Sequence, residues 1–445
     1  MQSLIFFVIA LALLVVIHEY GHFWVARRCG VKVLRFSVGF GKPIWKKIGK
    51  DGVEYVLAPI PLGGYVKMLD EREMPVEENL TQFAFNRQSL AKRFAIVLAG
   101  PVANLLFAIV AYWFLLVVGI PGIKPVISEI VPQSIAADAG LTAGDTIKSI
   151  GGQDTPTWNS VFKALLLKAE QGGDIDIEVL TDNVSTPHRI SVPKLDIEDA
   201  PTVLNKVGLI PLRPVLNPVL GKIVDGMPAQ KAGLKTGDVL LSANGQRLST
   251  WSEWVNVIQQ HPNKTLEIRL LRQQQEMTFS VTPQAGDDGQ GLIGAGVDTT
   301  KTTVPDELKS ELRYGPILAF PQAVMNTWDF SVSTLTSLWG MIKGTVSTDN
   351  LGGPISIAKV AGSSAEQGWM SFVSFLAMIS ITLGILNLLP IPMLDGGHLS
   401  MFIIEAIRGK PLSETTQVQA QKIGMIILLA VMFVAFFNDL SRLFG

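Results

Sequence analysis

The chain has 445 residues, of which 48% are hydrophobic, and its mean hydropathy is +0.35. That average is too apolar for an ordinary soluble enzyme and favours a polytopic membrane protein with at least one soluble part. The formal net charge of −1 argues against nucleic acid as a partner. The one cysteine, Cys29, excludes an internal disulfide framework and a cysteine-based zinc cluster, so any metal site must use His, Asp or Glu.

Four apolar blocks predict membrane-spanning helices, at about 3–25, 94–119, 370–390 and 423–437. Each is close to the ~20 residues that a helix needs to cross the hydrocarbon, although the last block is short. The first block has no preceding Lys or Arg, so we interpret it as an uncleaved span and not as a signal peptide.

The distribution of basic residues predicts the orientation of these spans. They gather after the first block, before the second, and between the last two, as Arg27, Arg28, Lys92, Arg93, Arg408, Lys410 and Lys422. The positive-inside rule assigns all three places to the cytoplasm. Both termini and the polar stretch 122–310 then lie outside, in the periplasm if the source is a diderm bacterium.

The first block ends in an H-E-x-x-H motif formed by His18, Glu19 and His22. On a helix, residues i and i+4 lie roughly 40° apart, so the two imidazoles can share one ion. Glu19 is rotated by about 100° from His18 and can reach a water on that ion. Ionisable groups inside a span are costly, which favours a function over a structural role. A catalytic zinc has three protein ligands and an open position, so a third ligand is required from elsewhere.

The polar stretch contains an internal repeat. Residues 130–158 align without gaps to residues 223–251, an offset of 93 residues that corresponds to one small domain. The shared "AGLxxGDxIxxxxGQ" pattern resembles PDZ domains in a circularly permuted arrangement. Alternating segments at 174–180 and 265–271 predict strands, and 251–261 predicts a short helix. A small β-rich module of another kind with glycine turns is the alternative.

A PDZ domain captures an extended peptide by adding it as a strand and binds a terminal carboxylate with backbone N–H groups. Val207–Leu212 is a candidate carboxylate loop in the first copy. An ordinary glycine-containing strand turn is the alternative interpretation of that segment.

The stretch Ile317–Ile342 has no Lys or Arg and raises the question of a further span. Asp329, Pro321 and many Ser and Thr residues make it a poor hydrocarbon helix. We therefore interpret it as an amphipathic element on the outer membrane surface. If it crossed the membrane, the end of the third block would lie on the side opposite to His18 and His22.

Asp395, at the end of the third block, is the best candidate for the third ligand. Pro390 and Pro392 break the helix before it, and the following glycines let backbone pass close to a site. Irregular backbone at membrane depth is tolerated where it lines a protein cavity. His398 is a rival ligand, whose alternative role is that of an interfacial histidine.

The combination of H-E-x-x-H, "GPVAN" (Gly100–Asn104) and L-D-G resembles the site-2 protease family of intramembrane zinc metalloproteases. Two PDZ-like copies between the second and third blocks narrow the resemblance to its regulator of sigma-E protease group. The resemblance covers essentially the whole chain. It implies that His18, His22 and Asp395 bind one zinc ion and that Glu19 is the catalytic base.

The resemblance also implies substrates and candidate substrate-binding residues. The expected substrates are single-span membrane proteins, in particular a pre-trimmed anti-sigma factor, and remnant signal peptides. The segment 52–69 resembles a membrane-reentrant β-loop with a bend at Gly63 and Gly64, and Gly39–Gly41 resembles a family loop; a cytosolic hairpin is the alternative for both. Asn387 and Asn104 are further candidates. Thr382 stands where close relatives carry another Asn, which weakens a two-asparagine clamp.

Together these patterns predict a polytopic α-helical membrane protein with four transmembrane helices, a membrane-associated β-loop and two tandem circularly permuted PDZ domains. It would lie in a bacterial inner membrane, with the active site near the cytoplasmic side. The expected boundaries are 1–121 for the N-terminal membrane part, 122–214 and 215–303 for the PDZ domains, 304–366 for a periplasmic surface segment and 367–445 for the C-terminal membrane part.

Two other function classes are weighed against a protease. A non-catalytic PDZ scaffold predicts a broken metal site, but H-E-x-x-H and L-D-G are complete. A zinc transporter needs a polar pathway through several spans, but the ionisable residues gather near one face. One tightly bound zinc and chelator-sensitive proteolysis would favour the protease.

Overall fold

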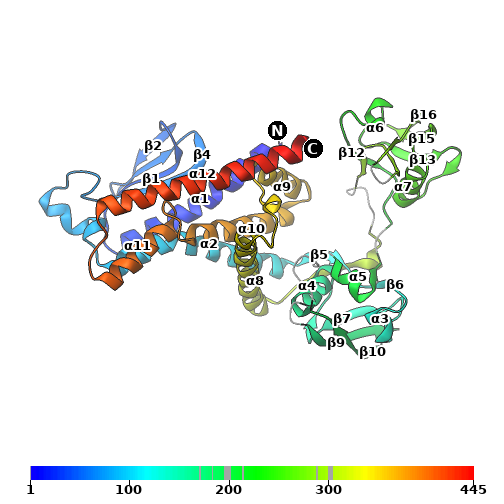
Figure 1. Ribbon diagram of the computed structural model, residues 1–445, viewed down its shortest axis with the longest axis horizontal. Coiled ribbons are helices and arrows are strands. Elements are labelled where there is room, and N and C mark those ends of the chain that lie inside the picture. Colours follow the sequence, from blue (N-terminus) through cyan, green and yellow to red (C-terminus); the bar gives the residue numbers. More distant parts are fainter. Residues whose placement is uncertain are drawn as a thin grey trace. The chain divides into compact units, whose positions relative to one another are not determined.

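The computed structural model describes residues 2–169, 172–182, 184–194, 202–212, 215–286, 289–298 and 304–444 (Figure 1). The chain divides into two compact units. Unit 1 combines Met1–Gly119 with Arg313–Gly445, and unit 2 is Ile120–Leu312. The two ends of the chain therefore fold together in unit 1, and the middle forms a separate body.

Four helices among the described residues are long and apolar enough to cross a membrane. They are α1 (Gln2–Arg28), α2 (Leu90–Val118), α10 (Trp369–Leu388) and α12 (Glu414–Phe444). They contain the four expected blocks, apart from a residue or two at the ends of the second and third. The predicted fourth block, 423–437, is shorter than α12, because the helix continues through the polar residues before residue 423.

Shorter elements complete unit 1. They are β1 (Val33–Phe40), β2 (Trp45–Ile48), β3 (Glu54–Leu57), β4 (Ile60–Met68), η1 (Glu78–Phe83), η2 (Phe85–Arg87), α8 (Pro316–Lys343), η6 (Thr348–Asn350), α9 (Pro354–Glu366) and α11 (Asp395–Arg408). Helix α8 is not among the four long apolar helices. The stretch Ile317–Ile342 is thus helical, as an amphipathic element requires, without adding a candidate span.

Helix α2 packs against both α1 and α10, and small residues allow the close approach. A Cβ atom built on Gly21 of α1 would lie 2.3 Å from the carbonyl oxygen of Ala99. On the other side, a Cβ on Gly384 of α10 would lie 3.1 Å from the carbonyl oxygen of Pro101. The backbones of three helices thus come together around one segment of α2.

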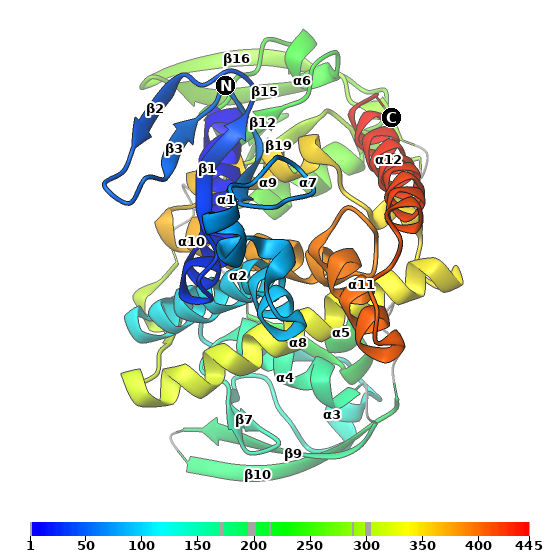
Figure 2. The ribbon, with the colours of Figure 1, turned by 90° about the vertical axis from the view of Figure 1, so that its left-hand side faces the viewer.

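A four-stranded sheet in the order β2-β3-β1-β4 lies beside α1 (Figure 2). Strand β1 is parallel to β3 and antiparallel to β4, with Val38 opposite Gly64. The segment 52–69 is therefore part of a larger sheet. Strand β4 is irregular at this place, because its register with β1 shifts between the pairs Val38–Gly64 and Phe40–Ile60, and Gly63 has a φ of +154°. A β-bulge bends the strand that carries it, which agrees with the expected bend at Gly63 and Gly64.

The chain between α10 and α11 forms a tight turn. Helix α10 ends at Leu388, and the N–H of Leu394 donates to the carbonyl of Ile391 across Pro392 and Met393. Met393 has a φ of +102°, which is unusual for a bulky residue and costs backbone strain. The prolines thus break the helix as expected, and Asp395 stands at the first position of α11.

The C-terminal end of α12 is fixed to the start of α9. Asp439 is 1% exposed, and its carboxylate accepts hydrogen bonds from the backbone N–H groups of Gly353, Ile355 and Ser356. A carboxylate at a helix N-terminus satisfies backbone donors that have no partner within the helix. This anchor joins the last helix of unit 1 to α9, which packs on α1.

Unit 2 contains two modules whose elements follow the same order up to the last strand of each four-stranded sheet. After that strand the described residues of the first module form a helix and one strand, whereas those of the second form three short strands. The first comprises β6 (Ile127–Ile130), α3 (Ile135–Asp138), β7 (Thr146–Ile150), β8 (Gln153–Asp154), α4 (Trp158–Ala169), β9 (Gly173–Thr181), β10 (Val184–Val192), α5 (Val203–Val207) and β11 (Leu209–Pro211). The second comprises β12 (Leu220–Ile223), α6 (Pro228–Lys231), β13 (Val239–Ala243), β14 (Gln246–Arg247), α7 (Trp251–Gln259), β15 (Leu266–Arg272), β16 (Gln275–Val281), β17 (Gln284–Ala285), β18 (Gly291–Leu292) and β19 (Ala295–Val297).

The internal repeat therefore corresponds to a repeated fold. Written from the equivalent edge, the strand orders of the two sheets are β8-β7-β9-β10 and β14-β13-β15-β16, which match position by position. Each module also has its own apolar core. The two predicted strands and the predicted helix correspond to β9, β15 and α7. Asp145 and Asp238, at equivalent positions, are both buried and accept from the N–H of Thr142 and Lys235.

Strands β5 (Ile120–Ile123) and β20 (Lys309–Leu312) pair with each other, next to the short helix η5 (Asp306–Leu308). Ile123 lies opposite Lys309, so the two ends of unit 2 are adjacent. Unit 2 includes β20 and ends at Leu312. The expected bounds of the PDZ domains, 122–214 and 215–303, stay predictions.

Candidate metal centre

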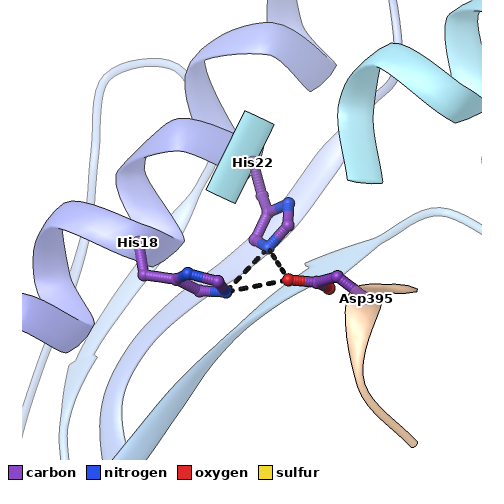
Figure 3. A group of neighbouring side chains, drawn as sticks. All are labelled: His18, His22 and Asp395. Carbon is purple, nitrogen blue, oxygen red and sulfur yellow. Dashed lines mark hydrogen bonds and ion pairs between the residues drawn. The ribbon is translucent and has the colours of Figure 1, made fainter. Parts of the chain in front are cut away.

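Two turns of α1 and the first residue of α11 bring three side chains together (Figure 3). The Nε2 atoms of His18 and His22 lie 3.2 Å apart. Oδ2 of Asp395 lies 3.1 Å from Nε2 of His18 and 3.4 Å from Nε2 of His22. The i, i+4 spacing on α1 sets the first distance, whereas the second and third depend on how α11 is placed.

The second ring nitrogen of each histidine has a partner on α2. Nδ1 of His22 lies 2.8 Å from the carbonyl oxygen of Ile96, which can only accept. The proton of His22 is therefore on Nδ1, and Nε2 presents its lone pair to the site. Nδ1 of His18 lies 3.3 Å from Nδ2 of Asn104. Both rings thus point Nε2 towards Asp395.

The three side chains fit a zinc ion by the chemistry of their donors. Two imidazole nitrogens and one carboxylate oxygen are ligands that zinc takes in catalytic sites. Oδ2 of Asp395 is buried and has no hydrogen-bond donor among the described residues, as expected for a lone pair reserved for a cation. Among the described residues, His18, His22 and Asp395 form the one group of ligand atoms within 4.8 Å of one another, and His398 is not in it.

Glu19 lies at the edge of the same site. Its Cγ would be 3.0 Å from a Cβ atom built on Gly64 of β4, so strand and glutamate are in contact. The absence of a side chain at Gly64 lets β4 approach α1 at the level of the histidines. Glu19 is only partly buried and remains available for proton transfer.

A cavity of about 890 Å³ opens from these residues. Its wall includes His18, Glu19, His22, Asp395, Gly64, Asn387, Met393 and His398, and continues past Arg35, Asp70, Arg72, Arg93 and Glu405. The metal ligands and the glutamate thus face one polar space inside unit 1.

Two predicted substrate-binding residues do not face this cavity. Asn104 is 1% exposed, and its amide contacts His18. A contact between Asn104 and substrate stays a prediction. Gly63 packs against the ring of Phe40, since neighbouring residues of β4 alternate between the faces of the sheet. Gly64 and Asn387 do line the cavity.

Three lesser expectations have simple structural outcomes. Thr382 donates to the carbonyl of Met378 on its own helix. Gly39 packs closely on the carbonyl of Ala58 within the sheet. Val207–Leu212 covers the end of α5 and strand β11, and its use as a carboxylate loop stays a prediction.

The sequence analysis did not predict that the backbone of α2 contacts the two histidine rings. A Cβ atom on Gly100 would lie 2.2 Å from Nε2 of His22 and 2.9 Å from Cε1 of His18. Arg93 forms an ion pair with Glu405 of α11, with Nη2 2.5 Å from Oε1 and Nη1 3.2 Å from Oε2. The signal was present in the sequence, since 93, 96, 100 and 104 recur at helical spacing.

Comparisons with known proteins identify the family and several relatives. The family model Peptidase family M50 matches residues 6–431. The chain is 43% identical over 444 residues to the Regulator of sigma-E protease RseP of Escherichia coli (strain K12), with 98% of each chain covered. It is 44% identical over 449 residues to Protease RseP of Yersinia pestis, with 99% of each covered.

Two further matches complete the comparison. A Vibrio cholerae protein provisionally named a zinc metalloprotease is 43% identical over 452 residues, with 99% of each chain covered. The crystal structure of a PDZ domain of the SdrC-like protein from Listeria monocytogenes matches 20% of this chain and 90% of its own. Its identity is 17% and its TM-score is 0.16, values too low to support a statement about fold.

Proposed function

Because this chain belongs to peptidase family M50 and is an intramembrane zinc metalloprotease of the site-2 class, we propose that His18, His22 and Asp395 hold one zinc ion and that Glu19 is the catalytic base. The observation that carries this proposal is the convergence of the three ligand atoms within 4.8 Å. Glu19 lines the same cavity. No other described residues form such a group.

The chemistry follows from this arrangement. A bound zinc ion would lower the pKa of water and polarise the scissile carbonyl. Glu19 accepts a proton from the water that attacks the carbonyl carbon, and a C–O bond forms. Glu19 then gives the proton to the leaving nitrogen as the C–N bond breaks, which yields a carboxylic acid and an amine. The second proton of the water passes from the acid to the amine, so the products leave as a carboxylate and an ammonium group.

The substrate binds as an extended strand. A peptide bond within a helix is shielded by its own hydrogen bonds, so the helix must unwind before cleavage. Strand β4 is at an edge of its sheet and passes Glu19 at Gly64, which supports pairing of substrate backbone with β4. Asn387 lines the cavity and offers an amide to the substrate carbonyl.

The substrates are single-span membrane proteins, namely an anti-sigma factor already trimmed outside the membrane, and remnant signal peptides. The sigma-E pathway in the names of the relatives supports the first. The protein lies in a bacterial inner membrane, with unit 2 in the periplasm. Basic residues after α1 and at the start of α2 support a site near the cytoplasmic side.

The two modules of unit 2 are tandem circularly permuted PDZ domains that control access of the substrate. The element order that β6–β10 shares with β12–β16 and the shared glycine turns support this assignment. They either exclude substrates with bulky outer domains or tether the substrate C-terminus, and a deletion described in the Discussion separates these two roles.

The decisive experiment co-expresses the chain or its Glu19→Gln variant with candidate single-span proteins. The wild-type chain produces a shortened product, and purified protein contains one zinc ion per chain. Glu19→Gln retains zinc and fold but cleaves at least ~100-fold more slowly, the scale of general base catalysis. Glu366→Gln, on the exposed end of α9, is the control. Near wild-type cleavage by Glu19→Gln would overturn the assignment of the base.

A further inference from the structure

Helix α2 supplies none of the three proposed metal ligands, but one face of it contacts α1, which carries His18 and His22, and α11, which carries Asp395. Arg93, Ile96, Gly100 and Asn104 recur at intervals of three and four residues, so they lie along one side of the helix. We call these four residues the alignment face. Each makes a different contact, and together the contacts reach α1 and α11.

Gly100 and Ile96 position His22. The ring of His22 lies on the α2 backbone where Gly100 has no side chain, and a Cβ there would also meet Cε1 of His18 at 2.9 Å. One turn earlier, the carbonyl of Ile96 accepts from Nδ1 of His22 at 2.8 Å. The ring is thus fixed by a hydrogen bond on one side and by backbone contact on the other.

The side chain of Asn104 contacts Nδ1 of His18, as the Ile96 carbonyl contacts Nδ1 of His22. Oδ1 of Asn104 is buried and has no partner among the described residues, while Nδ2 lies 3.3 Å from Nδ1 of His18. A histidine that binds a metal through Nε2 carries its proton on Nδ1 and needs an acceptor there. Rotation of the amide by 180° gives that proton Oδ1 as its acceptor. The unpaired oxygen is therefore explained by the metal-bound form.

Arg93 fixes the helix that carries Asp395. Its guanidinium pairs with both carboxylate oxygens of Glu405 and lies 5.1 Å from the ring centroid of Phe402. The Arg93 and Glu405 side chains are only 13% and 16% exposed, so water screens the pair weakly. Two parallel hydrogen bonds define an orientation as well as a distance. The pair thus holds α11 at a defined position on α2.

We infer that the alignment face of α2 orients the metal ligands, with Asn104 and the Arg93–Glu405 pair as positioning residues. Asn104 sets the tautomer and ring plane of His18, and the ion pair sets the position of Asp395. The inference rests on the proposed ligand set. It adds three residues that are not metal ligands but control how tightly the metal is held.

The test measures zinc affinity of the purified full-length protein by competition with a chelator. Asn104→Leu removes the acceptor, and zinc affinity falls 10- to 100-fold, the usual effect of losing such a partner. Asn104→Asp restores affinity to the wild-type level or above it, because a carboxylate accepts from Nδ1–H. Thr327→Val, which removes a buried hydroxyl from α8, is the matched control.

The aspartate variant separates positioning from packing. If Asn104 only filled space, a buried carboxylate would be worse tolerated than leucine. Weaker zinc binding by Asn104→Asp than by Asn104→Leu would therefore overturn this part of the inference. If Asn104→Leu fails to fold, Asn104→Asp is compared with wild type instead, and a zinc affinity at least tenfold below wild type would overturn this part of the inference.

The ion pair is tested by exchanging its charges. Arg93→Glu and Glu405→Arg each lower zinc affinity at least tenfold, and the double variant recovers most of the loss. Arg93→Lys, which keeps the charge but loses the paired geometry, falls between wild type and Arg93→Glu. In each folded variant kcat decreases more than KM rises, because the substrate contacts remain.

Zinc binding also distinguishes this inference from the proposed function. If wild-type protein bound no zinc, the ligand set itself would fail. If His18→Ala abolished zinc binding but the Asn104, Arg93 and Glu405 variants kept wild-type affinity, only the role of the alignment face would be wrong.

Discussion

Gly100 and His22 touch each other directly, because a Cβ atom at residue 100 would come within 2.2 Å of Nε2 of the imidazole. Backbone of α2 and a proposed metal ligand on α1 therefore share a space that admits no methyl group. The "GPVAN" motif has a physical meaning in this contact, since it supplies both the gap at Gly100 and the buried amide at Asn104.

Gly100→Ala is expected to displace His22 and to lower zinc affinity by at least tenfold. The added methyl group would overlap the imidazole of His22, because no space separates that ring from the α2 backbone at residue 100. Alanine stabilises a helix by about 1 kcal/mol over glycine, so helix propensity alone would predict the opposite effect on the fold. Chelator competition and circular dichroism measure the two effects. Gly315→Ala, which meets open space at the start of α8, is the control.

Asp439→Ala is expected to loosen α12. The substitution leaves the N–H groups of Gly353, Ile355 and Ser356 without their acceptor, at a cost of about 1–3 kcal/mol in the free energy of unfolding. Thermal unfolding and limited proteolysis of the purified protein measure it. Asp349→Ala, an exposed carboxylate on the neighbouring turn, should change neither. Equal melting temperatures of Asp439→Ala and Asp349→Ala would contradict the proposal that Asp439 fixes α12 to the start of α9.

The turn after β4 should give a pH-dependent contribution to stability. Burial tends to raise the pKa of Asp70, but hydrogen bonds from the side chain and backbone of Arg72 outweigh it and hold the pKa below its usual value. A lowered pKa in the folded state contributes stability above the unfolded pKa of about 3.9, and the contribution is lost as pH falls. Asp70→Asn should therefore lower the melting temperature at pH 7, and the difference should shrink below about pH 4. A constant difference would rule out this linkage.

Removal of unit 2 separates the two roles proposed for its modules. Because Ile123 lies opposite Lys309 in the β5–β20 pair, residues 125–307 can be replaced by a short glycine-serine turn. Faster cleavage of an intact, untrimmed substrate would support a size filter. Slower cleavage of a trimmed substrate would support tethering, and zinc content checks that unit 1 is intact. Unchanged rates for both substrates would argue against either role.

Much of the fold could be predicted because its signals are local. Apolar length identified α1, α2, α10 and α12, and the repeat identified two equivalent modules. Helix ends were less accurate, as α12 shows, since a helix can continue through polar residues that hydropathy excludes. The sequence did not indicate a second role of Gly64, which is to let strand β4 approach Glu19 of α1 closely.

The pairing of His18 with His22 follows from local sequence, because one turn of helix places both rings on the same face. Sequence patterns also identified Asp395 as a candidate, but the position of this carboxylate within 3.4 Å of both rings depends on how α11 packs. The direction of Asn104, the gap at Gly100 and the Arg93–Glu405 pair were likewise decided by packing. Local spacing specifies which side of a helix a residue occupies, whereas the neighbour on that side depends on contacts between segments far apart in the chain.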